Sequence, residues 1–539
     1  MKPRNTNSNY REHPKTMENI VNELGRQALA QPEKAAIIDK AFSFIGYKYR
    51  SFSYARLAND VAHAAKILQD RGIKPGDRIL VFVPMSYSLY VTLLAIFYTG
   101  AVAVFIDAWA DKRRLRQACA LMQPVGFIGS LKAQLLRVLS DIRKIPIKLT
   151  VGSLRTKSSD LPPASFAGAQ RAPDDEALVT MTTGSTGQPK GVKRTYESLN
   201  NQARSHQDHL PMAPDDVDLT ALPIFVLSNL IQGATSVLPR FNPAKPDRFK
   251  PKVILNQIRS CGVTSSIGSP AFFEKLADHM LSENQKTNLN CIYTGGAPVF
   301  KTLAIKLKQA FDCSEVFIVY GCSEVEPISK IKVDDVVTSD VALGVPVGAG
   351  VTGLEVKLLR PHEEPIVLSP QYPITSFEAG PGEIGEIVLA GSHVVKGYIG
   401  DQEATRQNKI LEGAKVWHRT GDAGSMDDQG RIYIQGRIKN RMTHDGRTFY
   451  PLPFEQKLTE LNQVEFSAVL EVEGKAFVVI EALKSSSAEE QKQILQNAKE
   501  IMDGISCQYL ILDKIPRDPR HRSKVNFEEM KKLIADSHL

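Results

Sequence analysis

The chain has 539 residues, of which 42% are hydrophobic and 23% are charged, and it carries a formal net charge of +8. This length exceeds one ordinary domain, and the composition is typical of a soluble globular protein with two or more lobes. A charge this mild over so long a chain favours a solvated surface, and we expect no nucleic-acid partner.

The first twenty residues contain no apolar core, so we expect a flexible arm over residues 1–20 and no secretory signal. Six cysteines are scattered without any C-x-x-C pair. This spacing predicts neither a zinc site nor a disulfide framework, and it fits a reducing, cytoplasmic location.

No charged residue occurs between Arg78 and Asp107, a stretch long enough to cross a membrane. Pro84 and Gly100 interrupt it, and the pattern predicts a strand over 78–84, a helix over 86–100 and a strand over 101–107. We therefore expect a buried βαβ unit and no membrane span.

Short apolar runs continue to alternate with helical patterns down the chain, which predicts an α/β fold with mainly parallel sheets covered by helices. The helix candidates are 50–72, 196–207 and 269–281, and the further strand candidates are 126–130, 176–181, 217–224, 235–239, 264–269, 291–296 and 315–321. From Val341 onward, short strands with Gly turns indicate a small β subdomain. A compact α+β piece follows, and we place a domain boundary near Arg437–Lys439.

A Gly-rich loop, "MTTGSTGQPKGVKR" from Met181 to Arg194, follows a predicted strand and precedes a helical pattern. Exposed backbone N–H groups at such a turn can hold phosphate, and glycines let phosphate oxygens approach closely. The residues expected to contribute are Thr182, Thr183, Gly184, Ser185, Thr186, Gly187, Lys190 and Gly191. The alternative is a flexible surface loop without a ligand.

This loop differs from the P-loop of common NTPases, because Pro189 precedes Lys190 and Gly191 follows it. No hydroxyl follows the lysine, so a magnesium ligand must come from elsewhere in the chain. A second match by letters, "GAGVTG" at 348–353, is followed by a strand pattern and is interpreted as a β-turn region.

The segment "MTTGSTGQPKGV" resembles the signature of the adenylate-forming superfamily, which includes acyl-CoA synthetases, peptide-synthetase adenylation domains and luciferases. Further segments match this superfamily in order: "YTGGAP" at 293–298, "YGCSEVEP" at 320–327 and "HRTGDAGSMDDQGRIYIQGR" at 418–437. The resemblance implies an N-terminal adenylation domain over 21–436, a mobile C-terminal domain over 437–539, and the use of ATP, Mg²⁺ and a small-molecule carboxylic acid.

The resemblance also implies roles for individual residues, each with a structural alternative. Glu324 would bind magnesium, and Asp422 would accept hydrogen bonds from ribose, assisted by Arg437 at the hinge. Tyr320 would stack on adenine. The remaining residues expected around the nucleotide are Gly295, Gly296, Ala297, Gly321 and Ser323. The alternatives are a surface position for Glu324, a turn for Asp422 and core burial for Tyr320.

Lys524, in "PRHRSKVN" just before the last helical pattern, stands where the superfamily keeps a catalytic lysine. Its implied role is to bridge the substrate carboxylate and the α-phosphate, because a positioned cation relieves the repulsion between these anions. The alternative is an ordinary lysine in a basic surface run.

Several positions depart from the superfamily pattern in a shared direction, toward the β-lactone synthetases of bacterial hydrocarbon biosynthesis. These positions are Tyr196, Val226, Lys439, Thr443, Arg522 and Ser523. The resemblance implies activation of a fatty or 3-hydroxy acid, whose own hydroxyl then expels AMP. Thioester formation on CoA or a carrier protein, amide formation and a non-catalytic nucleotide-binding protein remain alternatives. The run "PIFVLSNLIQG" is either an acyl pocket or buried core.

Overall fold

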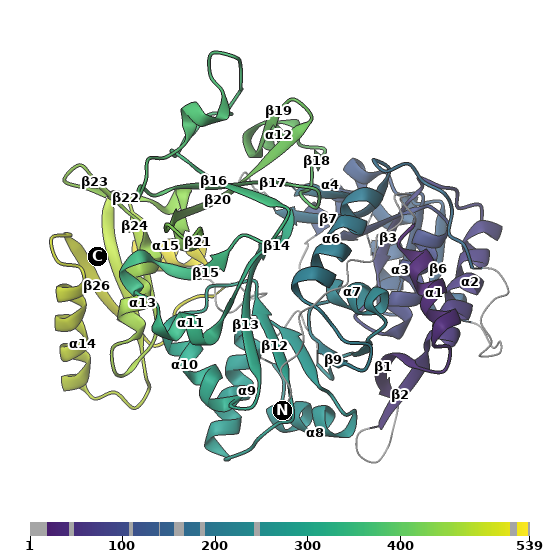
Figure 1. Cartoon of the computed structure of the whole chain (residues 1–539), viewed down its shortest axis with the longest axis horizontal. Coiled ribbons are helices and arrows are strands. Elements are labelled where there is room, and N and C mark those ends of the chain that lie inside the picture. The colour runs from purple at the N-terminus through teal and green to yellow at the C-terminus, as the bar shows by residue number, and fades with distance from the viewer. Residues whose placement is uncertain are drawn as a thin grey trace.

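The computed structural model describes residues 19–41, 48–106, 112–139, 141–155, 166–183, 189–241, 248–517 and 525–536. In Figure 1, the purple and blue N-terminal elements and the yellow C-terminal elements lie at opposite ends of the molecule, with the teal and green elements between them. The predicted arm falls almost wholly outside the described residues. The fold is α/β with parallel sheets and a small C-terminal domain, as the sequence predicts.

Within the described residues, the largest sheet has eight strands, and its interior strands are parallel while both edge strands are antiparallel. Its order is β14 (Val325–Lys332), β13 (Glu315–Cys322), β12 (Cys291–Gly295), β11 (Ser265–Gly268), β9 (Val217–Thr220), β10 (Thr235–Val237), β1 (Ala35–Ala41) and β2 (Lys48–Ser53).

A second sheet has seven strands among the described residues. Its order is β18 (Tyr398–Ile399), β8 (Pro189–Thr195), β7 (Glu176–Thr183), β4 (Val102–Ile106), β3 (Arg78–Phe82), β5 (Gly126–Gly129) and β6 (Ile147–Thr150). In this sheet β7, β4, β3, β5 and β6 are parallel, and β8 pairs antiparallel with β7 and β18. The uncharged stretch is β3, α3 (Tyr87–Tyr98) and β4, as predicted. No helix in the described part of the chain has the length and apolar character to cross a bilayer.

Helices cover these sheets, and their apolar faces form buried clusters with them. They are α1 (Val21–Ala30), α2 (Tyr54–Asp70), α4 (Lys112–Met122), α5 (Leu136–Leu139), α6 (Tyr196–His209), α7 (Ile224–Gln232), α8 (Pro251–Ser260), α9 (Pro270–Ser282), α10 (Lys301–Ala310) and α11 (Val333–Thr338). The helix predicted over 50–72 begins only at Tyr54. The preceding residues pair with β1 as β2, and the Ser53 hydroxyl accepts from the Arg56 N–H to cap the helix.

The predicted β subdomain is a sheet of β15 (Val345–Ala349), β21 (Arg431–Arg437), β20 (Lys415–Met426), β17 (Gly385–Gly391) and β16 (Leu354–Leu359), with β19 (Lys409–Glu412) beside β20. The short helix α12 (Gln402–Asn408) precedes β19. The "GAGVTG" segment connects two strands, and Gly348 and Gly353 have φ of +88° and +83°. The interpretation of this segment as a turn region is therefore confirmed.

The C-terminal elements form a three-stranded sheet with helices beside it. They are β22 (Met442–His444), β23 (Arg447–Phe449), α13 (Pro451–Thr459), β24 (Val464–Val472), β25 (Lys475–Ala482), α14 (Ala488–Ile501), β26 (Cys507–Leu512) and α15 (Phe527–Asp536). Two apolar clusters cover the two faces of this sheet, so it has a core of its own. The domain boundary near Arg437–Lys439 remains a prediction.

Candidate functional site

A cleft of about 2910 Å³ runs between the large sheets, the β subdomain and the C-terminal domain. Motifs that are far apart in sequence meet on its walls, because the carboxyl ends of neighbouring parallel strands open at one edge of a sheet. Lys190, Gly295, Tyr320, Glu324 and Asp422 all line it.

The Gly-rich loop connects two antiparallel strands, β7 and β8. The helix predicted after this segment is confirmed as α6, which begins at Tyr196, but the residues from Pro189 to Thr195 form a strand, β8, that pairs with β7. Thr182 and Thr183 lie at the end of β7, and residues 184–187 lie outside the described residues. Lys190, near the start of β8, is half-buried at the cleft wall.

Lys190 and Glu324 come together as an ion pair, with Nζ 3.8 Å from Oε1. Tyr398, which sequence reasoning missed, completes the group. Its hydroxyl donates to Glu324 Oε1 at 2.7 Å, and the Lys190 ammonium lies 3.8 Å from the centre of its ring. β18 carries Tyr398 here by pairing with β8, so the contact depends on tertiary structure that no local motif signals.

A second lysine, Lys409 at the start of β19, stands behind this group and is only 4% exposed. Its ammonium donates to the Val395 carbonyl, and the Val395 N–H donates to the Glu324 carbonyl at 2.9 Å. Burial lowers the pKa of Lys409 to about 8, while nearby Glu324 opposes that shift. Lys409 therefore places a buried positive charge near Glu324, and it fixes the backbone of Val395, which is hydrogen-bonded to the backbone of Glu324.

The surroundings keep Glu324 ionised. Burial alone would raise the pKa of its carboxyl, but the facing His418 imidazole, the Tyr398 hydrogen bond, and the Lys190 and Lys409 cations lower it to about 2. The site thus combines one carboxylate with two cations, and it suits a ligand that brings further negative charge together with a metal ion.

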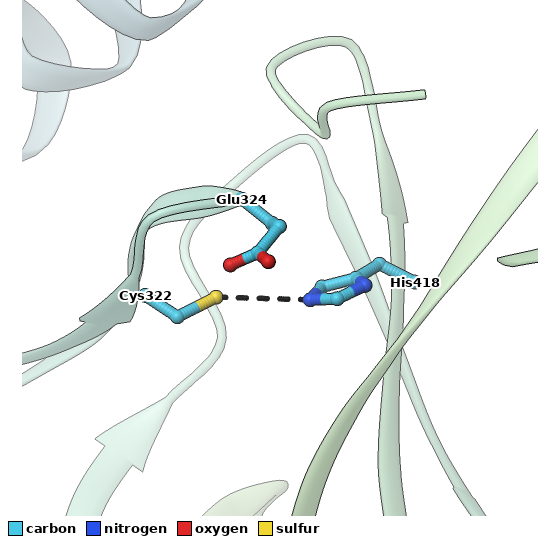
Figure 2. Close-up of side chains that lie close together, drawn as sticks. All are labelled: Cys322, Glu324 and His418. Carbon is cyan, nitrogen blue, oxygen red and sulfur yellow. Dashed lines mark hydrogen bonds between the residues drawn. The ribbon is translucent and has the colours of Figure 1, made fainter. Parts of the chain in front are cut away.

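Figure 2 shows Cys322, Glu324 and His418 pointing toward one another. Their ligand atoms lie within 4.8 Å of one another, with Cys322 Sγ 3.8 Å from His418 Nε2. His418 Nδ1 lies 3.3 Å from the Asn408 carbonyl, so Nδ1 carries the hydrogen and Nε2 faces the thiol. Among these three groups only the carboxylate is a hard oxygen ligand, so Glu324 is the residue that fits Mg²⁺.

On the opposite wall, Asp422 joins Tyr320 and Arg437. Asp422 and Arg437 are cross-strand partners on β20 and β21, and Arg437 Nη1 lies 2.9 Å from Asp422 Oδ1. The Tyr320 hydroxyl donates to Asp422 Oδ2 at 2.7 Å. An ionised carboxylate has about four acceptor sites, so Asp422 retains capacity for ribose hydroxyls.

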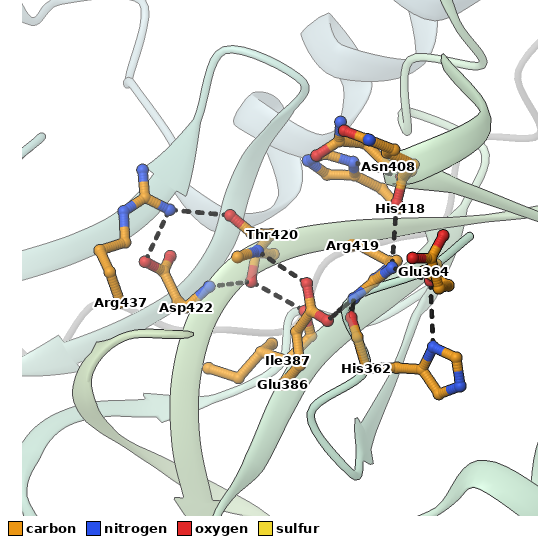
Figure 3. A network of polar contacts seen from close by, with 12 residues as sticks. His362, Glu364, Glu386, Ile387, Asn408, His418, Arg419, Thr420, Asp422 and Arg437 are labelled. Carbon is orange, nitrogen blue, oxygen red and sulfur yellow. Dashed lines mark hydrogen bonds and ion pairs between the residues drawn. The ribbon is translucent and has the colours of Figure 1, made fainter. Parts of the chain in front are cut away.

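A buried network behind Asp422 fixes the part of β20 that carries it (Figure 3). Glu386 Oε2 accepts from Arg419 at 2.7 Å, and these side chains are 4% and 8% exposed. Glu386 Oε1 accepts from the Gly421 N–H at 3.1 Å, and the Thr420 hydroxyl donates to the Ile387 carbonyl at 2.8 Å. Asp422 therefore lies in a strand that is held by buried contacts, and not in the surface turn of the alternative interpretation.

Gly295, Gly296 and Ala297 line the cleft after β12, beside Tyr320. A Cβ on Gly295 would lie 2.2 Å from the Val319 carbonyl oxygen, so glycine here permits close packing of β12 against β13. Gly296 has φ of +91°, which favours glycine, and a Cβ there would meet open space. Gly321 and Ser323 also line the cleft.

The cleft lining also includes the apolar side chains of Leu222 and Phe225 and the charged residues Arg194 and Glu326. Arg194 is 8% exposed and donates to Thr180 Oγ1 at 2.9 Å and to the Ser323 carbonyl at 2.7 Å. Burial raises the pKa of Glu326 to about 7, with the Arg194 charge opposing. Sequence reasoning assigned neither residue a role, although Arg194 ends the Gly-rich segment and Glu326 lies within "YGCSEVEP".

Lys524 lies outside the described residues. Described residues on both sides of it, Arg517, Val525 and Phe527, line the cleft. Lys439, at the predicted hinge, lines it as well, whereas Thr443 is exposed on β22. Of the departures near the loop, Tyr196 is 3% exposed and Val226 is fully buried, so both side chains belong to the core.

Comparisons with known proteins identify the family of the chain. Residues 24–399 match the family model described as AMP-binding enzyme. The chain is 32% identical to the olefin β-lactone synthetase of Xanthomonas campestris pv. campestris, over 79% of this chain and 80% of that one. It is 28% identical to a feruloyl-CoA synthase of an Amycolatopsis species, over 80% and 84% of the two chains.

Among solved structures, the fold is similar to that of the amide bond synthetase McbA from Marinactinospora thermotolerans. The TM-score is 0.78 at 19% identity, covering 96% of this chain and 99% of that one. ATP-bound MatB from Rhodopseudomonas palustris gives a TM-score of 0.77 at 22% identity, covering 96% and 100%. The chain belongs to the AMP-binding enzyme family, and it is an adenylate-forming acid ligase that resembles β-lactone synthetases.

Proposed function

We propose that this enzyme activates a 3-hydroxy carboxylic acid with ATP and then closes it to a β-lactone. The observation that carries the first step is the meeting of Lys190, Glu324, Asp422 and Arg437 in one cleft. In that step a carboxylate oxygen of the acid attacks the α-phosphorus of ATP. The bond to the β-phosphate oxygen breaks, giving acyl-AMP and pyrophosphate.

The residues act mainly by positioning and by charge neutralisation. Lys190 and the Gly-rich loop would hold the β- and γ-phosphates, and Lys409 adds a buried charge behind them. Asp422 would accept ribose hydroxyls while Arg437 and Tyr320 keep its carboxylate in place. Lys524 would stabilise the charge that develops between the carboxylate and the α-phosphate.

A magnesium ion fits this arrangement. Mg²⁺ commonly uses one or two carboxylates together with substrate phosphates, and Glu324 is an ionised, half-buried carboxylate at the cleft wall. Among the described residues, both contacts to its carboxylate involve Oε1. When bound, the ion would neutralise phosphate charge.

For the second step, the 3-hydroxyl oxygen attacks the acyl carbon, the acyl–phosphate C–O bond breaks, AMP leaves, and the hydroxyl proton passes to solvent. The identity to olefin β-lactone synthetases supports this outcome, as do Lys439 and Thr443 at positions where the superfamily keeps other residues. The alternative is a thioester on CoA or a carrier protein, which the similarity to feruloyl-CoA synthases favours.

Two assays test the proposal. Acid-dependent ATP–pyrophosphate exchange should occur with the wild type and fall at least about hundredfold in Glu324→Gln, with the exposed Glu355→Gln as the matched control. Products from a 2-alkyl-3-hydroxy acid, with and without CoA, should be the same dehydrated lactone. A thioester as sole product, formed only with CoA, would overturn the lactone step and leave adenylation standing.

A further inference from the structure

Among the carboxyl groups that line the cleft is Glu326, for which adenylation provides no role. It lies near the start of β14, two residues after Glu324, and both glutamates line the cleft, while Val325 between them belongs to an apolar core. Alternation along the strand thus turns Glu326 toward the cleft.

The glycine at position 321 leaves room for the Glu326 side chain. A Cβ on the facing Gly321 would come within 3.3 Å of Glu326 Cγ, so glycine makes room for the glutamate. Arg194 lies nearby, but its hydrogen bonds go to Thr180 and Ser323. Within the described part of the chain, no residue forms a hydrogen bond or an ion pair within 4.0 Å with the Glu326 carboxylate.

Packing does not account for a carboxyl group in this place. Placing a partly buried polar group without a hydrogen-bond partner costs free energy, and the cleft lining also includes the apolar side chains of Leu222 and Phe225. An apolar residue on β14 would complete such a surface at lower cost. The Glu326 carboxylate is therefore available to accept a hydrogen bond from the bound acid.

Its position limits where that donor sits on the acid. Two residues of extended chain span at most about 7 Å, so Glu326 lies within one side-chain length of Glu324 and the phosphate end of the cleft. The donor must lie close to the reacting carboxylate rather than far along an acyl chain. A hydroxyl on the third carbon of the acid meets this requirement.

We propose that Glu326, oriented by the charge of Arg194, accepts a hydrogen bond from the 3-hydroxyl of the acid and selects hydroxy acids over their deoxy analogues. This inference rests on the proposed function, since it concerns the acid of that same site. It makes Glu326 a specificity-determining residue in the activation step.

The test compares adenylation of two acids of equal chain length, one with the 3-hydroxyl and one without it. ATP–pyrophosphate exchange gives kcat/KM for each acid. The wild type should prefer the hydroxy acid about tenfold to hundredfold, since a site built to bond a hydroxyl discriminates against analogues that lack it. Glu326→Leu should lose this preference and keep exchange with the deoxy acid within about threefold.

Two variants complete the design. Glu326→Gln, which retains an acceptor oxygen, should keep part of the preference. Glu363→Leu, which removes an exposed carboxylate at another part of the cleft, should keep all of it. If Glu326→Leu does not bind ATP, Glu326→Ala replaces it, and it should likewise lose the preference for the hydroxy acid while keeping exchange with the deoxy acid.

The inference fails if the wild type shows no preference, if the preference survives loss of the carboxyl group, or if activity with both acids falls equally. Because exchange reports only the first step, a CoA thioester as final product would overturn lactone formation and leave the role of Glu326 intact. If the lactone forms but the wild type does not prefer the hydroxy acid, the proposed role of Glu326 is overturned and lactone formation stands.

Discussion

Replacing Lys409 by Met removes a buried positive charge while keeping a side chain of similar length. Lys409 is 4% exposed, and among the described contacts its ammonium donates to the Val395 carbonyl. Because Val395 in turn contacts Glu324, we expect this lysine to serve the phosphate site at a cost to stability. The variant should therefore be more stable and less active.

The magnitude follows from the pKa of Lys409, which burial lowers from 10.5 to about 8. Each pKa unit corresponds to about 1.4 kcal/mol, so keeping this lysine protonated in the folded state costs about 3 kcal/mol below pH 8. Loss of its hydrogen bond offsets about 1 kcal/mol of that gain. Lys409→Met should thus gain about 2 kcal/mol in unfolding free energy at pH 7.

The pH dependence has a definite sign. The unfolded chain binds this proton more tightly than the folded chain, so the cost is complete below pH 8. It shrinks as the pH rises from 8 toward 10.5. The stability advantage of Lys409→Met over the wild type should decline over the same window.

Urea unfolding followed by tryptophan fluorescence at pH 7 and pH 10, together with ATP–pyrophosphate exchange at pH 7, provides the test. The exchange rate should fall about tenfold. Lys415→Met, on the neighbouring strand at an exposed position, is the matched control and should change neither quantity appreciably. A variant less stable than the wild type at pH 7, or a stability difference that is the same at both pH values, would refute this reasoning.

Three further predictions concern the nucleotide wall and the C-terminal domain. In initial-rate measurements, Asp422→Asn should raise the KM for ATP about tenfold and leave the KM for the acid unchanged. The amide weakens the contact with Arg437 and is a poorer acceptor for ribose hydroxyls than the carboxylate. Equal changes in both KM values would argue against a role in ribose binding. Lys524→Ala should lower exchange about hundredfold while calorimetry shows ATP binding within twofold of wild type, and unchanged exchange would remove this lysine from the mechanism. Glu386→Gln should cost about 3 kcal/mol in urea unfolding, because it leaves the buried Arg419 without its carboxylate, whereas the exposed Glu355→Gln should cost almost nothing.

The sequence predicted the parallel sheets and the β subdomain because strand and helix patterns are local. It also indicated that Lys190, Glu324, Asp422 and Arg437 act in one site, and the structure brings these residues to one cleft. The hydrophobic pattern did not distinguish a strand from the start of a helix or a loop where a strand directly precedes a helix. Residues 48–53 form an edge strand through pairing with β1, and residues 189–195 form β8 through pairing with β7.

Tyr398, Lys409 and Glu326 could not be predicted as site residues, for a physical reason. Lysine and glutamate are ordinarily exposed, and nothing in the neighbouring residues indicates that Lys409 is buried. Tyr398 reaches Lys190 only because the short strand β18 pairs with β8 across about two hundred residues of chain. Such contacts depend on how distant strands assemble.

The central claim is that one acid oxygen leaves with AMP and that the acid then closes on its own hydroxyl. Mass spectrometry with a 2-alkyl-3-hydroxy acid carrying ¹⁸O in both carboxylate oxygens tests this directly. We expect AMP to gain one ¹⁸O, and the organic product to be the acid less one water, with one ¹⁸O retained in the lactone carbonyl. Unlabelled AMP, or an organic product that retains both labelled oxygens, would contradict the account.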